Sequence, residues 1–408
     1  MLWPTVLANR QLIAEAEAQE ALDTPAVVAR LLKLAGDERR VWFAIELMQA
    51  RRKAAGKLAA ADRIIADTEG VEQSTGATIA ALKAARFADA GADHVVDACA
   101  GVGGDAMALG RVGEVTLVDR DPDRVWASRH NTRLVGGAVH AAVAADAGDL
   151  QLHGRWLHID PSRREAGRRF HQYDQLIPGP AVVERLVGQT LGAAVKLSPG
   201  VDPDPLPPGE LQFISEDRKL RQAVLWTGRL AQAPRSAVAL PSGATLQGAP
   251  DVPPCGEPDR YLLAVDPAVE RAELMAALAD RLDAVALHPK LGLLTRPTAA
   301  SDPFVTCFER MASMGYHERR LRAWLRDHDA GIVEVKTRGG AIEPNRLANR
   351  LRGKGATLYT VFVLREGKRK VAHVTRRRDT ARGAADDPSS DSRSAPTGPG
   401  VARPAPPT

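Results

Sequence analysis

The chain has 408 residues with a formal net charge of +5, and 44% of them are hydrophobic, which is ample for the cores of two or more domains. Its three cysteines are widely separated and include no C-x-x-C pair, so we expect no metal site, no disulfide scaffold and a reducing, cytoplasmic location. The start lacks a basic region followed by an apolar run, and no apolar stretch reaches membrane-spanning length, so we expect neither a signal peptide nor a membrane partner.

The first 70 residues carry apolar side chains at helical spacing. Val27-Val28, Leu31-Leu32 and Val41-Trp42 with Ile45 follow the period of an amphipathic helix. We therefore expect a helical amino-terminal lobe over residues 1–70, which packs on the following domain or shapes its substrate entrance.

A glycine-rich turn follows the first expected strand. The run from Val95 to Asp105 has the pattern of a buried strand, a turn containing Gly101 and Gly103, and the start of a helix. Glycines let a backbone approach a ligand closely, and a helix amino end offers free N–H groups. The next strand, 115–119, ends in a carboxylate that can accept both hydroxyls of a ribose. Together they predict a pocket for an adenosine-containing cofactor.

The spacing of this turn discriminates between two cofactors, a nicotinamide dinucleotide and S-adenosylmethionine. The dinucleotide fingerprint G-x-G-x-x-G needs a third glycine, but Met107 and Ala108 stand where that spacing would end. A carboxylate at Asp97 would repel a pyrophosphate, whereas Asp97 and Asp105 favour a positive amino group and a sulfonium. The turn therefore favours S-adenosylmethionine over the dinucleotide, and a tight strand–helix corner without a ligand is the plainer alternative.

Strands and helices alternate after this turn. Asp121-Pro122 starts a helix that ends before Gly136, further strands are expected over 139–143 and 156–159, and a fifth ends near Lys196. This alternation predicts a mostly parallel sheet flanked by helices, in which ligands bind beyond the carboxyl ends of the strands. Each of four successive strand ends carries an acid: Asp97, Asp119, Asp146 and Asp160. Any one of them alone would merely cap a turn or helix, but four in series indicate a site. Two antiparallel strands, 211–215 and 222–226, are expected to close the sheet.

The rest of the chain divides by composition. Residues 231–325 are expected to be a connector that contains a strand at 261–265 and a helix at 267–282, and the tail 377–408 is expected to be disordered.

From 331 to 378, 13 Lys and Arg residues stand against three Glu, within a pattern of strands and one helix. This basic α/β module suits the phosphate backbone of RNA, and a merely solvated surface is the alternative. The residues expected to bind RNA there are Lys336, Arg338, Arg346, Arg350, Arg352 and Lys354.

The chain resembles a known family in two places. Residues from about 70 to 230, including Glu72 to Gly76, Lys83 to Phe87 and the Asp-x-Cys-x-Gly-Val-Gly-Gly-Asp run, resemble class I S-adenosylmethionine-dependent methyltransferases, and in particular the RNA guanosine N-methyltransferase group that includes trimethylguanosine synthase. Residues from about 331 to 375 resemble the THUMP-like domain that follows this methyltransferase in a family of bacterial proteins. The resemblance implies an α/β fold with a Rossmann-like seven-stranded sheet over 71–230 and a THUMP-like domain over 326–376.

The resemblance also implies site residues. Transfer of the methyl group is placed at Asp160, Pro161 and Ser162. Enzymes that methylate exocyclic amines often carry a second proline and an aromatic ring after this point, where this chain has Ser162 and Arg163. The basic residues Arg163 and Arg164 are expected to guide a polyanionic substrate to the site. The residues expected to contact the cofactor are Gln73, Thr75, Asp97, Ala98, Gly101, Gly103, Asp105, Asp119, Arg120 and Asp146.

Methyl transfer from a sulfonium requires mainly that nucleophile and methyl group be held in line in a dry site. The carboxylate of Asp160, or a carbonyl at Pro161, can accept a hydrogen bond from an amine and stabilise the charge that develops on it. His158 lies within a strand pattern, which indicates packing or a hydrogen-bonded position.

We expect a methyltransferase acting on a base nitrogen in structured RNA. The alternatives are a small-molecule methyltransferase and a non-catalytic RNA-binding protein that retains the fold.

Overall fold

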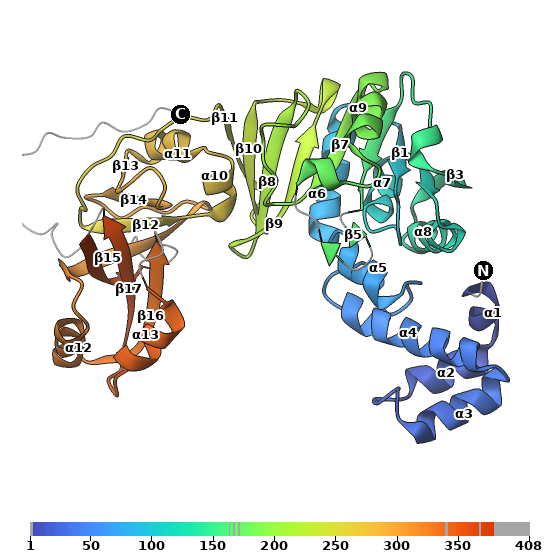
Figure 1. Ribbon diagram of the computed structural model, residues 1–408, viewed down its shortest axis with the longest axis horizontal. Helices are drawn as coiled ribbons and strands as arrows, with labels where there is room; N and C mark the ends of the chain where they lie inside the picture. Colours follow the sequence, from blue (N-terminus) through green and yellow to red (C-terminus); the bar gives the residue numbers. More distant parts are fainter. Residues whose placement is uncertain are drawn as a thin grey trace, which may run out of the picture. The chain divides into compact units, whose positions relative to one another are not determined.

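The computed structural model describes residues 3–162, 164–165, 168–169, 172–338, 342–366 and 369–378. The chain divides into two compact units, one made of Met1–Arg296 with Asp302–Thr306, the other of Pro297–Ser301 with Cys307–Thr408 (Figure 1). Of the tail expected to be disordered, 377–408, the first residue belongs to a strand that ends at Arg377, and the part from 379 onward lies outside the described residues.

The amino-terminal segment is helical, as its periodicity predicts. Val27, Leu31 and Val41 lie in one buried cluster, and Ala127 of a later helix joins that cluster, so the lobe packs onto the rest of the first unit. Trp42 is left 47% exposed. The helices of this segment are α1 (Trp3–Ala8), α2 (Arg10–Glu17), α3 (Pro25–Ala35), α4 (Glu38–Ala54) and α5 (Thr68–Gln73).

The first unit is built on a nine-stranded sheet with the order β11-β10-β8-β9-β7-β4-β1-β2-β3. The strands from β7 to β3 in this order run parallel, and β9 is antiparallel to both of its neighbours. The strands are β1 (His94–Ala98), β2 (Glu114–Asp119), β3 (Ala138–Ala144), β4 (Trp156–Ile159), β7 (Gly192–Leu197), β8 (Glu210–Glu216), β9 (Lys219–Trp226), β10 (Arg235–Leu240) and β11 (Ala244–Gly248).

The number of strands expected for this sheet needs correction. We expected seven strands and a connector from 231, but β10 pairs in parallel with β8, and β11 forms a hairpin with β10. The strands expected over 211–215 and 222–226 are β8 and β9, which pair antiparallel as expected, but they do not close the sheet, because it continues beyond them through β10 and β11. The Pro- and Gly-rich composition of this region reflects its tight turns rather than a lack of strands.

Helices flank the sheet, and their ends follow local capping chemistry. Asp121 caps α8 by accepting a hydrogen bond from Asp123 N, and Pro122 occupies the first turn, which confirms the predicted start. In the sheet core, Phe87 of α6 meets Trp226 of β9 edge-on, with ring centroids 6.0 Å apart. These helices are α6 (Ala77–Asp89), α7 (Ala106–Val112), α8 (Pro122–Leu134) and α9 (Pro180–Gln189). Between β4 and α9, the short pair β5 (Arg164–Glu165) and β6 (Arg168–Arg169) forms a two-stranded sheet.

Residues 261–296 complete the first unit. The helix expected over 267–282 is two helices, because Glu273 adopts a left-handed backbone with φ +60° between them. The elements are β12 (Tyr261–Val265), α10 (Pro267–Arg271), α11 (Met275–Leu282), β13 (Val285–Ala286) and β14 (Leu293–Arg296), with the strand order β13-β14-β12.

The second unit is a small α/β module with the strand order β15-β18-β17-β16. Leucine pairs spaced four residues apart, Leu321 with Leu325 and Leu347 with Leu351, bury α12 and α13 in one core with Val333 and other strand residues. β15 and α12 precede the start expected at 326 and belong to the same module. Its elements are β15 (Val305–Gly315), α12 (Glu318–Asp327), β16 (Ala330–Arg338), α13 (Pro344–Leu351), β17 (Thr357–Glu366) and β18 (Arg369–Arg377).

Candidate functional site

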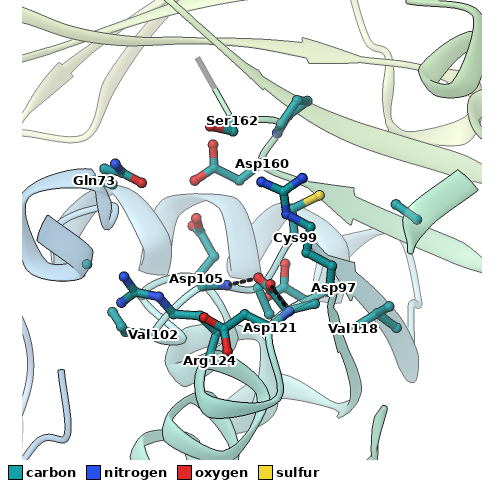
Figure 2. Close-up of a pocket in the computed structure, with 18 of the residues that line it drawn as sticks. Gln73, Asp97, Cys99, Val102, Asp105, Val118, Asp121, Arg124, Asp160 and Ser162 are labelled. Atoms are coloured by element: carbon teal, nitrogen blue, oxygen red, sulfur yellow. Dashed lines mark hydrogen bonds between the residues drawn. The ribbon is translucent and has the colours of Figure 1, made fainter. Parts of the chain in front are cut away.

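A cavity of about 350 Å³ opens at the carboxyl ends of β1, β2, β3 and β4. The four acids at or just beyond the ends of these strands all line it, so the edge expected from the sequence is a single site. In Figure 2, Gln73, Asp160 and Ser162 lie along one edge of the cavity, and Asp121 and Arg124 lie along the other. The volume is in the range typical of sites for small molecules.

Most of the residues expected to contact a cofactor do line the cavity. They are Gln73, Thr75, Asp97, Gly101, Asp105, Asp119, Arg120 and Asp146. Ala98 and Gly103 are not among its lining residues. Ala98 is fully buried in β1. Gly103 has a left-handed backbone with φ +87°, and a Cβ there would lie 2.8 Å from Ser128 Oγ, so this glycine is needed for the close approach of α8.

The carboxylate at the end of β2 fixes the glycine turn. Asp119 accepts hydrogen bonds from the backbone N–H of Gly101 at 2.9 Å and of Asp121 at 3.0 Å. Gly101 itself has φ +56° and nothing within 4 Å of the position that a Cβ would occupy. The turn therefore presents open backbone to the cavity, with a carboxylate directly beside it.

A network of buried charges forms the floor of the cavity. His158 Nδ1 lies 2.6 Å from Asp97 Oδ1, and its Nε2 lies 3.0 Å from Lys83 Nζ. Lys83 pairs with Asp105 at 2.6 Å, and Thr75 donates to the same carboxylate at 2.7 Å. This network ties the segment around Thr75 to the loop that starts α7.

Burial and pairing shift the proton affinities in this network. Burial raises the pKa of Asp97 and lowers the pKa of Lys83. Burial also opposes ionisation of Asp105, but the Lys83 ammonium, with His158 and Lys196 nearby, outweighs it and holds the pKa of Asp105 well below its usual range.

Sequence reasoning assigned no site role to three side chains here, Lys83, His158 and Lys196. His158 was expected in packing or a hydrogen-bonded position, and it is hydrogen-bonded, but it also lines the cavity. A lysine in the otherwise small and apolar run of α6 was the one local signal for Lys83. For Lys196, the penultimate residue of β7, no local signal existed.

The residues expected at the point of methyl transfer line another part of the cavity wall. Asp160, Pro161 and Ser162 line it together with Ile177 and Pro178. Ser162 and Ile177 exchange backbone hydrogen bonds of 2.7 and 3.0 Å, which brings two apolar side chains beside the transfer motif. Asp160 Oδ2 pairs with Lys196 Nζ at 2.5 Å, and Oδ1 has no hydrogen-bond partner among the described residues.

The basic residues expected to bind RNA divide into two groups. Lys336 pairs with Glu334 at 2.9 Å, and Arg350 makes a two-pronged pair with Glu318. Arg346, Arg352 and Lys354 are exposed and form no ion pair with any residue that the structure describes. We call these three the open basic set. Arg163, and the side chains of Arg164 and Arg338, lie outside the described residues.

Two features of the cavity suit S-adenosylmethionine. Asp97 Oδ2 is buried and has no hydrogen-bond partner in the described part of the chain, so an ammonium group entering the cavity would satisfy it. The open backbone at Gly101 lets a ligand approach closely. Within the described residues, no three His, Cys, Asp or Glu side chains are grouped so that they could hold a metal ion, and no helix is both long and apolar enough to cross a membrane.

Comparison with known proteins supports the same assignment. The chain is 30% identical over 354 residues to a protein of Mycobacterium tuberculosis described as an uncharacterized S-adenosylmethionine-dependent methyltransferase, and the match covers 83% of this chain and 96% of that protein. A second strain of that organism has a relative with the same identity and coverage. Residues 305–377 match the family described as THUMP domain-like.

The fold also matches a solved structure. A crystal structure from Porphyromonas gingivalis W83, assigned as a methyltransferase, aligns with a TM-score of 0.72 over 92% of this chain and 98% of its own. At 18% sequence identity, this likeness is evidence for the fold alone.

Proposed function

The chain belongs to the family of S-adenosylmethionine-dependent methyltransferases, and from that premise we propose that it methylates a base nitrogen in structured RNA, such as tRNA or rRNA. Bound S-adenosylmethionine supplies a methyl group activated by a positive sulfonium. The observation that carries the proposal is the position of Asp160. It directly follows β4 and lines the cavity, and its Oδ1 is available to accept a hydrogen bond from the molecule that is methylated.

Residues around the cavity have distinct roles in this proposal. Asp97 binds the ammonium of the cofactor through Oδ2, the oxygen without a partner among the described residues, and Asp119 accepts hydrogen bonds from the ribose hydroxyls. By the resemblance, Asp146, which also lines the cavity, is the acid near the adenine. Of the other seven residues expected to contact the cofactor, five line the cavity and two, Ala98 and Gly103, do not.

Asp160 orients the acceptor. A carboxylate that accepts a hydrogen bond from an amine N–H turns the nitrogen lone pair toward the methyl group and stabilises the charge that develops on the nitrogen. Ile177 and Pro178 offer an apolar surface next to Ser162, where many amine methyltransferases carry an aromatic ring. A flat, neutral base is the acceptor that suits this mixture of one carboxylate and an apolar wall.

The second unit supports RNA as the substrate. Residues 305–377 carry 17 Lys and Arg against seven Asp and Glu, and the open basic set is free to meet phosphates. An exposed cation without a protein partner gains most from a polyanion, because no ion pair has to be broken first.

The experiment is transfer of radiolabelled methyl from S-adenosylmethionine to total cellular RNA and, in parallel, to the small-molecule fraction of the same cells. We expect label in RNA, in a modified base identified by mass spectrometry of nucleosides. Asp160→Ala should lose transfer by about a hundredfold while S-adenosylmethionine binding stays intact. Label in the small-molecule fraction alone would contradict RNA as the substrate. Full activity of Asp160→Ala would contradict the role of that carboxylate.

A further inference from the structure

Lys196 joins two parts of the cavity wall. It lies in β7, which pairs with β4, and its side chain is only 5% exposed. Its ammonium contacts Asp160 Oδ2 at 2.5 Å and donates to the backbone carbonyl of Gln73 at 3.1 Å. A buried ammonium is stable only where such partners replace water. One side chain therefore connects the transfer motif with the segment that begins at Gln73.

The Gln73 carbonyl belongs to the carboxyl end of α5, where helix carbonyls lack partners within the helix. The two carbonyls before it, of Val71 and Glu72, accept hydrogen bonds from Lys57 Nζ at 2.6 and 2.9 Å. Two ammonium groups thus cover three successive carbonyls at the negative end of this helix. Of the two lysines, Lys196 is the one that also contacts Asp160.

This arrangement decides which oxygen of Asp160 meets an acceptor. Oδ2 is held by Lys196, and Oδ1 makes no hydrogen bond with any described residue. Lys196 also bonds the Gln73 carbonyl. If the segment from Gln73 to Thr75 moved away, the ammonium would lose this partner, and the Asp160 carboxylate would no longer be held in one orientation. Thr75 is in turn bonded to Asp105 at the floor of the cavity.

We propose that Lys196 is a positioning residue that couples the two ends of the cavity. The segment from Gln73 to Thr75 lines the cavity and holds the Lys196 ammonium through the Gln73 carbonyl, and the ammonium orients the Asp160 carboxylate for the acceptor. A cofactor that contacts this segment thereby fixes Asp160 as well. This inference rests on the proposed function, in which Asp160 orients the acceptor.

The test compares three variants of the full chain by calorimetric binding of S-adenosylmethionine and by hydrogen–deuterium exchange with and without it. In the wild type, the cofactor should slow exchange in peptides covering 70–76 and in peptides that contain Asp160. Lys196→Met should weaken binding by about tenfold and abolish the protection of the Asp160 peptides. Lys196→Arg should keep most of that protection, because a guanidinium can bridge the same two acceptors.

Lys57→Met is the matched control. It removes an ammonium from the same helix end but not from Asp160, so the Asp160 peptides should stay protected when the cofactor binds. Equal protection of these peptides in wild type and Lys196→Met would overturn the coupling, as would equal losses in the two Met variants. Circular dichroism checks folding, and if Lys196→Met does not fold, loss of the protection in Lys196→Gln replaces it.

The result is separable from the proposed function. Binding and exchange need no acceptor, so coupled protection in a protein that leaves RNA unmethylated would support the role of Lys196 and contradict RNA as the substrate.

Discussion

The cavity of the first unit and the open basic set of the second unit both gather charge, but they hold it differently. At the cavity floor, Asp97, Asp105, Lys83 and His158 are buried, and each contacts a member of the opposite charge or a ring nitrogen. In the second unit, Arg346, Arg352 and Lys354 are exposed and unpaired within the described residues. Buried charges must be matched inside the protein, whereas exposed charges are screened by salt and remain free for a partner. The comparison indicates that the cavity selects its ligand by the positions of its paired groups, whereas the basic surface selects a partner only by its negative charge.

The largest expected effect comes from breaking the buried network. Lys83→Met leaves Asp105 buried without its cation and should lower the free energy of unfolding by about 3–5 kcal/mol, measured by urea denaturation. The matched control is Lys219→Met, an exposed lysine at the start of β9, which should change stability by less than about 0.5 kcal/mol. Restoring part of the loss with Asp105→Asn in the Lys83→Met background would confirm the cause. Equal stability of the two Met variants would contradict it.

The next effect tests the ligand side of the cavity. Asp119→Ala removes the acceptor for Gly101 N and the acceptor proposed for the ribose, so S-adenosylmethionine affinity should fall by about a hundredfold in calorimetry. Asp280→Ala removes an exposed acid from α11 and should leave affinity unchanged. NAD serves as the comparison ligand and should bind neither protein. Unchanged S-adenosylmethionine affinity of Asp119→Ala would show that the cofactor does not use the end of β2.

A smaller effect is expected from the basic surface. Replacing the open basic set by alanine should weaken binding of a labelled RNA hairpin by about tenfold and lower the slope of log affinity against log salt by about 2. Fluorescence anisotropy across a salt series measures both. Alanine at Lys33, Arg39 and Lys219 makes the same charge change in the first unit and should have little effect on either quantity. A uniform loss in both triple variants would mean that only net charge matters.

The smallest effect is a dependence of stability on pH at Lys57. Burial, followed by the charge of Lys196, lowers the pKa of Lys57 to about 8. Between pH 8 and the usual lysine range, the unfolded chain keeps a proton that the folded chain has released, so stability should rise with pH in this window. Because the side chain is half-exposed, the rise should stay below about 1 kcal/mol. Urea denaturation from pH 7 to pH 10 measures it, and Lys57→Met should lack it.

Local chemistry explains which elements could be predicted from the sequence. The helix α8 begins at its Asp-Pro cap and ends before paired glycines, as expected, because capping acts within one turn of the chain. The strands β1, β2, β3, β4 and β7 were predicted because each is a short apolar run between turn residues. β10 and β11 were missed, since Pro and Gly around them favoured a connector, and α12 was missed because its apolar residues are few among many charged ones.

The convergence of the four acids could be expected from the sequence alone, because parallel strands place their carboxyl ends at one edge of a sheet. The partners of those acids could not. His158 stands 61 residues from Asp97 and 75 from Lys83, and Lys196 stands 123 residues from Gln73. The periodicity of apolar residues and the capping of helices depend on a few neighbouring residues, so the sequence alone defines strands, turns and the class of fold. Which cation neutralises which buried carboxylate is decided only when the sheet order brings distant segments together and removes the water between them.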